Sequence, residues 1–212
     1  LITSSAASDV YKRQIKGYKI KDIRGKDLII VGNVMSRGNN VIEYILKNKL
    51  KYTSGPAWLH ENVLKDKKII AVSGTHGKTT TTAMIVKILK ENKFNPSYLI
   101  GGSPKGGFSS VAITNSKYFV IEADEYDTAF FDKRSKFIHY KPDIVVINNI
   151  EYDHADIFED IEVIIKSFHH MIRLIPSNGS IVINKCDANI KKLLKLGYLS
   201  LIHISEPTRR RT

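Results

Sequence analysis

The sequence has little cysteine and no long apolar runs. Cys186 is the one cysteine among 212 residues, so no disulfide can form within the chain. This fits a protein of the reducing cytoplasm, where disulfides are rare. No stretch reaches the roughly 18 apolar residues that a membrane-spanning helix requires. We therefore expect a cytoplasmic protein without a membrane partner.

Acidic residues are few relative to basic ones. The chain has 21 Asp and Glu against 33 Lys and Arg, which gives a formal net charge of +12 at pH 7. The basic residues neither gather on one helix nor alternate with aromatic residues, so we expect no nucleic-acid partner. A lysine-rich surface around a site for anionic substrates accounts for the charge equally well.

The two ends of the chain differ in character from the rest. Residues 1–14 (LITSSAASDVYKRQ) and 199–212 (LSLIHISEPTRRRT) resemble translated sequencing-adapter read-through, and neither has a signal-peptide pattern. We expect both to be non-native tails outside the fold. A pair of natural disordered tails is the alternative, with the same consequence for the fold.

Between these ends, strand-like and helix-like segments alternate. Apolar, β-branched runs predict strands buried on both faces, as in a parallel sheet covered by helices. These runs lie at residues 28–31, 69–72, 98–100, 118–121, 144–147 and 181–183. The fold class is therefore α/β, a doubly wound and mainly parallel sheet, with a domain break between Gly55 and Lys67.

Four helices are predicted between the strands. Asn40 should cap the first, and Pro56 suits the first turn of a second that runs through Leu64. A third should begin near Thr79 and end near Asn92, with an apolar stripe at Ala83, Val86, Ile88 and Leu89. The fourth is strongly amphipathic, with apolar residues at Ile161, Ile164, Ile165, Phe168, Ile172 and Ile175.

Residues 74–80 (GTHGKTT) lie where a strand gives way to a helix. Glycines let the backbone approach phosphate groups, and the N–H groups at a helix start point at the anion. Lys78 would hold the outer phosphates, and the Thr79 hydroxyl would bind the accompanying Mg²⁺. The full G-x-x-x-x-G-K-[ST] pattern is absent, because Val72 occupies the earlier glycine position; a plain glycine turn is the alternative. The expected nucleotide-binding residues are Gly74, Thr75, His76, Gly77, Lys78, Thr79, Thr80 and Thr81.

Polar residues follow two later strands. Residues 122–127 (EADEYD) come after one, and residues 148–156 (NNIEYDHAD) after the next. Ligands of such sheets collect at the carboxyl ends of the strands, so we expect these residues to meet the 74–80 loop. Thr79 and Glu122 offer hard oxygen ligands for Mg²⁺. His154 would be a general base or a hydrogen-bond donor to phosphate, and a solvated loop is the alternative for the carboxylates.

Together, these motifs resemble the Mur ligase family of ATP-dependent amide ligases in bacterial cell-wall synthesis. GTHGKTT is followed by EADE-x-D at 122–127 and by N-x-x-x-D-H at 149–154. The likeness extends to GNVMSRGN (32–39), SGPAWLHENVL (54–64) and FFDKRSKFIHY (130–140), and covers about residues 17–198. These longer stretches are similar to the branch that attaches the murein tripeptide L-alanyl-γ-D-glutamyl-meso-diaminopimelate to UDP-N-acetylmuramate in peptidoglycan recycling.

The resemblance implies a mechanism and a site. The muramate carboxylate would attack ATP to give an acyl phosphate, which the tripeptide amine would then attack. Lys78, Glu122 and His154 would be the catalytic residues, with ATP and Mg²⁺ as cofactors. Thr79 and Glu122 would bind one Mg²⁺, and Glu122 and His154 a second. Some family members carry a modified lysine at the position of His169; here we expect a packing or surface histidine.

The resemblance also implies that the chain is part of a longer enzyme. Residues 15–66 would be a remnant of the UDP-sugar domain, and residues 67–198 an incomplete ATP-binding central domain. We expect this chain alone not to ligate. Two other functions stay open, the related ligation of L-alanine to UDP-N-acetylmuramate and a non-catalytic nucleotide-binding module. The oligomeric state is not predicted.

Overall fold

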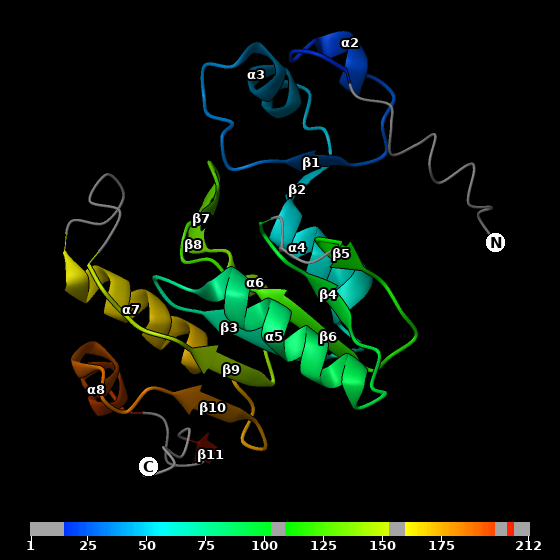
Figure 1. The fold of residues 1–212 in the computed structure, drawn as a ribbon. Helices are drawn as coiled ribbons and strands as arrows, with labels where there is room; N and C mark the ends of the chain where they lie inside the picture. The colour runs from blue at the N-terminus through cyan, green and yellow to red at the C-terminus, as the bar shows by residue number, and fades with distance from the viewer. Residues whose placement is uncertain (1–14, 103–108, 153–159, 198–202, 206–212) are drawn as a thin grey trace.

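The computed structural model describes residues 15–102, 109–152, 160–197 and, by backbone alone, 203–205. Within these residues a seven-stranded sheet forms the centre, in the order β11-β10-β9-β3-β6-β4-β5 (Figure 1). Neighbouring strands run parallel except for β4 with β5. The predicted α/β class is confirmed. The strands are β3 (Lys68–Ser73), β4 (Ser97–Leu99), β5 (Val111–Ala112), β6 (Tyr118–Glu122), β9 (Ile144–Ile147), β10 (Ser180–Ile183) and β11 (His203–Ser205).

Helices cover both faces of this sheet. On one face α5 (Lys78–Glu91) packs through Val86 against Ile70 and Val72 of β3. The opposite face of β3, with Ile69 and Ala71, belongs to the larger core. For β3 this alternation confirms the predicted burial on both faces. For the run at residues 28–31 the prediction is wrong, because Ile30 is 49% exposed. The helices that contribute to the larger core are α4 (Gly55–Leu59), its continuation η1 (His60–Leu64), α6 (Phe137–Tyr140), α7 (Ile161–Ile172) and α8 (Ala188–Lys195).

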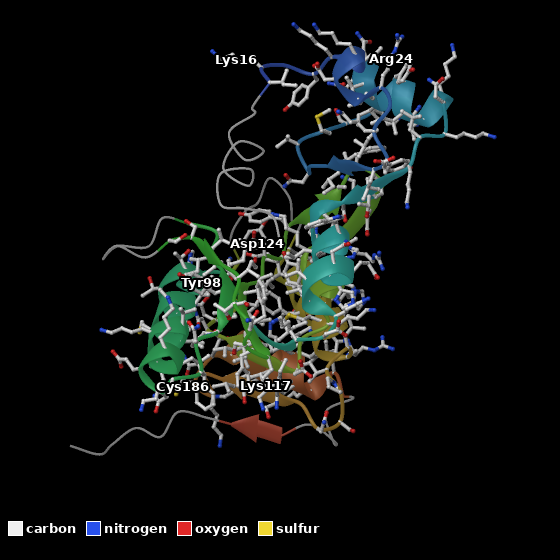
Figure 2. The ribbon with its side chains drawn as sticks, turned by 90° about the vertical axis from the view of Figure 1, so that its right-hand side faces the viewer. Lys16, Arg24, Tyr98, Lys117, Asp124 and Cys186 are labelled. Carbon is white, nitrogen blue, oxygen red and sulfur yellow. The ribbon has the colours of Figure 1, made fainter. Side chains whose placement is uncertain are left out.

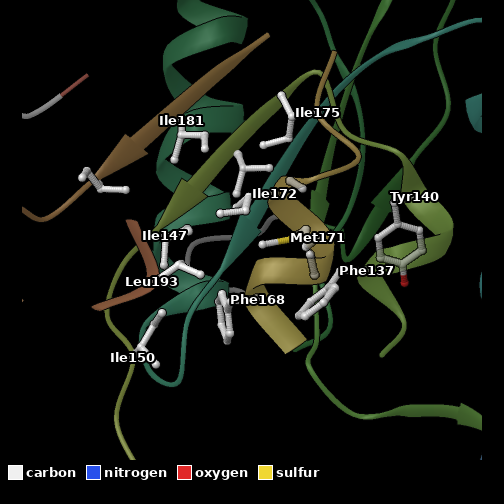
Figure 3. Close-up of a cluster of buried hydrophobic side chains, with 14 of the residues drawn as sticks. Phe137, Tyr140, Ile147, Ile150, Phe168, Met171, Ile172, Ile175, Ile181 and Leu193 are labelled. Carbon is white, nitrogen blue, oxygen red and sulfur yellow. The ribbon is translucent and has the colours of Figure 1, made fainter. Parts of the chain in front are cut away.

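The larger core is built mainly from isoleucine and aromatic side chains (Figure 3). The predicted stripe of α7 is buried there, and Phe168 lies 5.5 Å from Phe137 between ring centroids. For α5 the predicted stripe is wrong at Ile88, which is 56% exposed. The helix instead buries the side that carries Thr82 and Val86, and Ile88 falls outside the arc facing the sheet.

A small unit precedes the main sheet. It consists of α2 (Ile20–Ile23), β1 (Ile29–Val31), α3 (Asn40–Lys47) and β2 (Tyr52–Ser54), with β1 and β2 paired in parallel. Its core contains Val31, Val41, Ile42 and Ile45. The expected cap residue of α3 is off by one position. Asn39 has the extended backbone of a cap, and its side chain accepts a hydrogen bond from the Val41 N–H at 2.9 Å.

Two elements join the small unit to the main sheet. Pro56 lies in the first turn of α4, as expected, and the helix continues as the π-helical turn η1 to Leu64. Ser54, to which the sequence analysis gave no role, caps α4. Leu64 is fully buried in the larger core, so this helix packs with the main sheet. The hairpin of β7 (Asp127–Ala129) and β8 (Asp132–Ser135) extends from the main sheet to the small unit. Its Phe131 ring lies 4.9 Å from that of Tyr52, measured between ring centroids. The division into residues 15–66 and 67–198 stays a prediction.

The sheet extends into the segment expected to lie outside the fold. Residues His203–Ser205 form β11, which pairs in parallel with β10 at one edge of the sheet. In the part of the chain that the structure describes, no helix has the length and apolar character to cross a membrane.

Candidate nucleotide-binding site

The 74–80 loop connects β3 to α5 at the carboxyl edge of the sheet. Gly74 and Gly77 have φ values of 131° and 78°, which side-chain-bearing residues adopt only with strain. A Cβ atom on Gly74 would also meet the Asn149 carbonyl oxygen at 3.0 Å. Glycine is therefore required at Gly74 both for conformation and for space.

The order of the strands explains why distant motifs meet here. β3 lies between β6 and β9, and all three are parallel. In this register Val72 is opposite Glu122, and Ser73 is opposite Ile147, the residue before Asn148. The residues that follow β6 and β9 thus begin on either side of the loop.

Two asparagines after β9 support the loop. The Asn149 carbonyl accepts from the Thr75 N–H at 3.2 Å, and its side-chain oxygen accepts from the His76 N–H at 2.9 Å. Asn148 donates through Nδ2 to the carbonyl oxygen of His76 at 3.1 Å and to Thr81 Oγ1 at 3.0 Å. Sequence reasoning gave neither residue a role. Their position directly after a buried strand next to β3 was the available signal.

Lys78, the first residue of α5, turns its ammonium group back over the loop. Nζ donates to the Gly74 carbonyl at 2.7 Å and to Glu125 Oε2 at 3.1 Å. The side chains of Lys78 and Glu125 are 11% and 2% exposed. A positive charge is thus held beside the glycine loop, as predicted for a phosphate ligand, and its partner is a carboxylate to which sequence reasoning assigned no such role.

Thr79 and Glu122 are in direct contact. Thr79 Oγ1 donates to the Glu122 carboxylate at 3.0 Å, and the Gly101 N–H donates to Oε2 of the same carboxylate at 2.8 Å. A hydroxyl and a fixed carboxylate next to one another are the hard oxygen donors that Mg²⁺ prefers. The two residues therefore fit the magnesium site expected of them.

His154 lies outside the described residues, so its predicted role stays a prediction. Among the residues that are described, no group of three metal-ligating side chains is present. The other carboxylates after β6 turn toward lysines, with Asp124 3.2 Å from Lys136 Nζ and Asp127 2.8 Å from Lys133 Nζ.

The remaining predicted loop residues differ in exposure. The side chain of His76 is 56% exposed, with Nε2 3.8 Å from Glu151 Oε2. Thr80 is exposed on the first turn of α5, while Thr75 is buried and donates through Oγ1 to the Glu151 carbonyl at 3.2 Å. His169, on α7, is partly buried, and burial is the main cause of its lowered pKa.

A cleft of about 540 Å³ opens beside the site, between the small unit and the sheet. The small unit contributes Asn33, and the sheet contributes Glu122 at the edge of the cleft. Figure 2 shows Asp124 in this region, far from Lys16 and Arg24 at the outer end of the small unit. A larger cavity of about 720 Å³ lies elsewhere, between β8 and α7, and no residue of the 74–80 loop lines it.

A central parallel strand that runs through a glycine- and lysine-containing loop into a helix defines an α/β domain of the P-loop type. Residues 72–207 match the family model described as the Mur ligase middle domain. Because this match covers more than half of the 212 residues, the chain belongs to the Mur ligase family.

Curated relatives show the same relationship. The chain is 51% identical over 184 residues to the UDP-N-acetylmuramate--L-alanyl-gamma-D-glutamyl-meso-2,6-diaminoheptandioate ligase of Haemophilus influenzae, covering 86% of this chain and 41% of the relative. The Escherichia coli protein of the same name is 48% identical, in a match that covers 86% of this chain and 40% of that protein. A UDP-N-acetylmuramate--L-alanine ligase of Caldicellulosiruptor saccharolyticus is 36% identical, in a match that covers 91% of this chain and 41% of that ligase.

Solved structures agree. The corresponding Neisseria ligase of the tripeptide class superimposes with a TM-score of 0.85 at 43% identity, over 91% of this chain and 62% of that one. The murein peptide ligase of Psychrobacter arcticus superimposes with a TM-score of 0.78 at 41% identity. This match covers 91% of this chain and 42% of that one. The chain spans about two fifths of the length of the two ligases from Haemophilus and Escherichia.

Proposed function

We propose that the chain is the nucleotide-binding part of an ATP-dependent ligase that joins L-alanyl-γ-D-glutamyl-meso-diaminopimelate to UDP-N-acetylmuramate in peptidoglycan recycling in the cytoplasm. The observation that carries this proposal is the arrangement of Lys78 and the Thr79–Glu122 pair around a glycine loop. Identities of 51% and 48% to ligases of that printed specificity support the choice of substrates.

The chemistry requires two anions to approach each other, a carboxylate and the terminal phosphate of ATP. Catalysis of phosphoryl transfer is largely positioning and charge neutralisation. Lys78 and the backbone N–H groups of the loop would hold the phosphates. Thr79 and Glu122 would hold Mg²⁺, which supplies positive charge to the transferring phosphoryl group when bound. Attack of the muramate carboxylate on ATP would release ADP and give an acyl phosphate. The amine of the tripeptide would then attack the acyl carbon and expel inorganic phosphate.

The cleft of about 540 Å³ between the small unit and the sheet suits the sugar substrate. Its walls include Trp58 and Tyr140, together with Glu122 at the carboxyl end of β6. A substrate entering from the small unit would therefore present its carboxylate next to the proposed metal ligands. His154 would complete this site, in the role that the family resemblance implies.

The related L-alanine ligase is the second candidate, supported by 36% identity. Identity is higher to the tripeptide ligases, at 51% and 48%, which favours the tripeptide. Two chimaeras separate the candidates, one with the flanking regions of the Haemophilus influenzae relative and one with those of the Caldicellulosiruptor saccharolyticus ligase. We expect turnover of the tripeptide by the first and little turnover of L-alanine by the second; the reverse result would favour the L-alanine ligase.

Lys78→Ala tests the nucleotide site in the chain as it stands. Removing a charge that contacts polyphosphate should weaken Mg·ATP binding roughly 10- to 100-fold. Isothermal titration calorimetry measures this directly. Lys87→Ala, on the same helix with a side chain 64% exposed, is the matched control and should bind as the unmodified chain does. Equal affinity of the Lys78 and Lys87 variants would contradict the phosphate assignment.

A further inference from the structure

The ammonium group of Lys78 is fully engaged by acceptors of the chain itself. An ammonium has three N–H donors. The shortest contacts go to the Gly74 carbonyl at 2.7 Å and to Glu125 Oε2 at 3.1 Å, and the Thr75 carbonyl and Glu125 Oε1 both lie at 3.4 Å. A phosphate oxygen can therefore bind Lys78 only by displacing one of these acceptors.

Glu125 is the most buried charged group at this site. Its side chain is 2% exposed, and within the described part of the chain Lys78 is the partner of its carboxylate. Glu122 is held differently, by Thr79 and the Gly101 N–H, and Asp127 pairs with Lys133. Among the described residues, Glu125 is thus the carboxylate that neutralises the predicted phosphate ligand.

A buried carboxylate beside a polyphosphate site affects binding in two ways. It compensates the ammonium in the empty site, because a buried charge without a partner is costly. It also opposes an incoming phosphate, because like charges repel more strongly where water is scarce. Both effects favour the empty site over the occupied one.

We propose that Glu125 is a positioning residue that competes with phosphate for the Lys78 ammonium, so that nucleotide binds by exchange and is released readily. The inference rests on the proposed nucleotide-binding function and adds a residue that limits the affinity of that site. Lys78 would keep its contact with Gly74 and transfer donors from Glu125 and Thr75 to phosphate oxygens.

Glu125→Gln keeps the size of the side chain and removes its charge. We expect Mg·ADP and Mg·ATP to bind about tenfold more tightly to this variant, measured by isothermal titration calorimetry on the whole chain. The melting temperature without nucleotide should fall, because Lys78 loses its counter-charge, and the rise on adding Mg·ADP should be larger than in the unmodified chain. A purely structural role predicts weaker binding instead. Asp127→Asn, in the same segment but paired with Lys133, should change neither quantity.

Two further variants keep the test decisive if Glu125→Gln folds poorly. Glu125→Asp shortens the side chain by one methylene and should give intermediate tightening. Lys78→Met destabilises by leaving Glu125 unpaired, and adding Glu125→Gln to it should restore part of the lost melting temperature. Unchanged or weaker nucleotide binding in both Glu125 variants, with the unmodified chain binding normally, overturns this inference alone. Absence of binding in every variant, including the unmodified chain, overturns the proposed function and this inference with it.

Discussion

Glu122 is the last residue of β6, and its carboxylate is fixed by two donors from different parts of the chain. Thr79 Oγ1 lies 3.0 Å and the Gly101 nitrogen 2.8 Å from its oxygens. Its position at the strand end follows from the apolar run before it, and its contact with Thr79 follows from the parallel pairing of β6 with β3. The sequence predicted both partners of this contact but contained no signal for Gly101.

Glu122→Gln should raise the magnesium requirement for nucleotide binding. The amide keeps the volume of the side chain but loses the negative charge that a hard cation needs. We expect the Mg²⁺ concentration at half-maximal ATP binding to rise by about tenfold, corresponding to ~1.4 kcal/mol. A magnesium titration at fixed ATP measures it. Glu91→Gln, at the far end of α5, is the control. An unchanged magnesium titration for the Glu122 variant would exclude Glu122 as a ligand of the metal.

Asp132 forms a partly buried cluster with Arg134 and His139. Arg134 donates to both carboxylate oxygens, at 2.8 and 2.7 Å, and His139 Nε2 lies 2.9 Å from Oδ2. The side-chain hydrogen bond from Arg134 is the main cause of the lowered pKa of Asp132, about 2. Burial lowers the pKa of His139, and Asp132 opposes that effect.

The depressed pKa of Asp132 makes a prediction about acid stability. A carboxyl group whose pKa is lower in the folded state stabilises the fold above its unfolded pKa and loses that contribution as pH falls. The loss should occur between about pH 4 and pH 2 and amount to roughly 1–2 kcal/mol, since Arg134 is largely exposed. Asp132→Asn should be less stable at pH 6 and show a flatter decline below pH 4 in urea unfolding. A decline as steep as that of the unmodified chain would exclude this group as the cause.

At the scale of elements, the β7–β8 hairpin links the two parts of the described chain. Phe130 packs against the core of the small unit, and the Phe131 ring meets that of Tyr52 edge to face at 4.9 Å. The small unit has a core of few residues and a two-stranded sheet, which is marginal alone. Contacts from the hairpin are therefore expected to contribute to its stability.

Phe131→Ala should loosen the small unit while leaving the main sheet intact. Loss of an aromatic pair and part of its burial should cost about 1 kcal/mol. Amide hydrogen exchange of β1 and β2 should become faster by about fivefold, with β3 and β6 unchanged. Phe94→Ala, whose ring pairs with Tyr118 at 5.4 Å, serves as a control and should leave β1 and β2 unaffected. Equal exchange in the two variants would show that the hairpin does not hold the small unit.

The helices and strands also show which features the sequence patterns predict and which they do not. Apolar runs identified β3, β6, β9 and β10. In β3 and β6 the burial of both faces explains the run. Finer features depend on backbone conformation or on packing partners. The cap of α3 is Asn39 and not the predicted Asn40. The cap is the residue whose backbone is still extended, and that conformation cannot be read from the order of two adjacent asparagines. Ile88 proved exposed, because the sheet covers a narrower arc of α5 than its apolar residues span.

At the scale of the molecule, the site depends on three neighbouring strand ends. The pattern of strand, loop and helix located the 74–80 loop, and the parallel order β9-β3-β6 brings the later motifs to it. The sequence predicted that residues 122–127 and 148–156 meet the loop. The particular partners of Asn148, Asn149 and Glu125 could not be predicted, because they depend on how the side chains pack at the strand ends. The contribution of His154 stays a prediction.

A crystal structure of the chain with Mg²⁺ and a non-hydrolysable ATP analogue would show whether the 74–80 loop is the nucleotide site. We expect the terminal phosphates against the N–H groups of residues 74–80, with Lys78 Nζ on a phosphate oxygen and the metal on Thr79 Oγ1 and a Glu122 oxygen. A nucleotide bound elsewhere, or bound to the loop with Glu122 facing away from the metal, would contradict it.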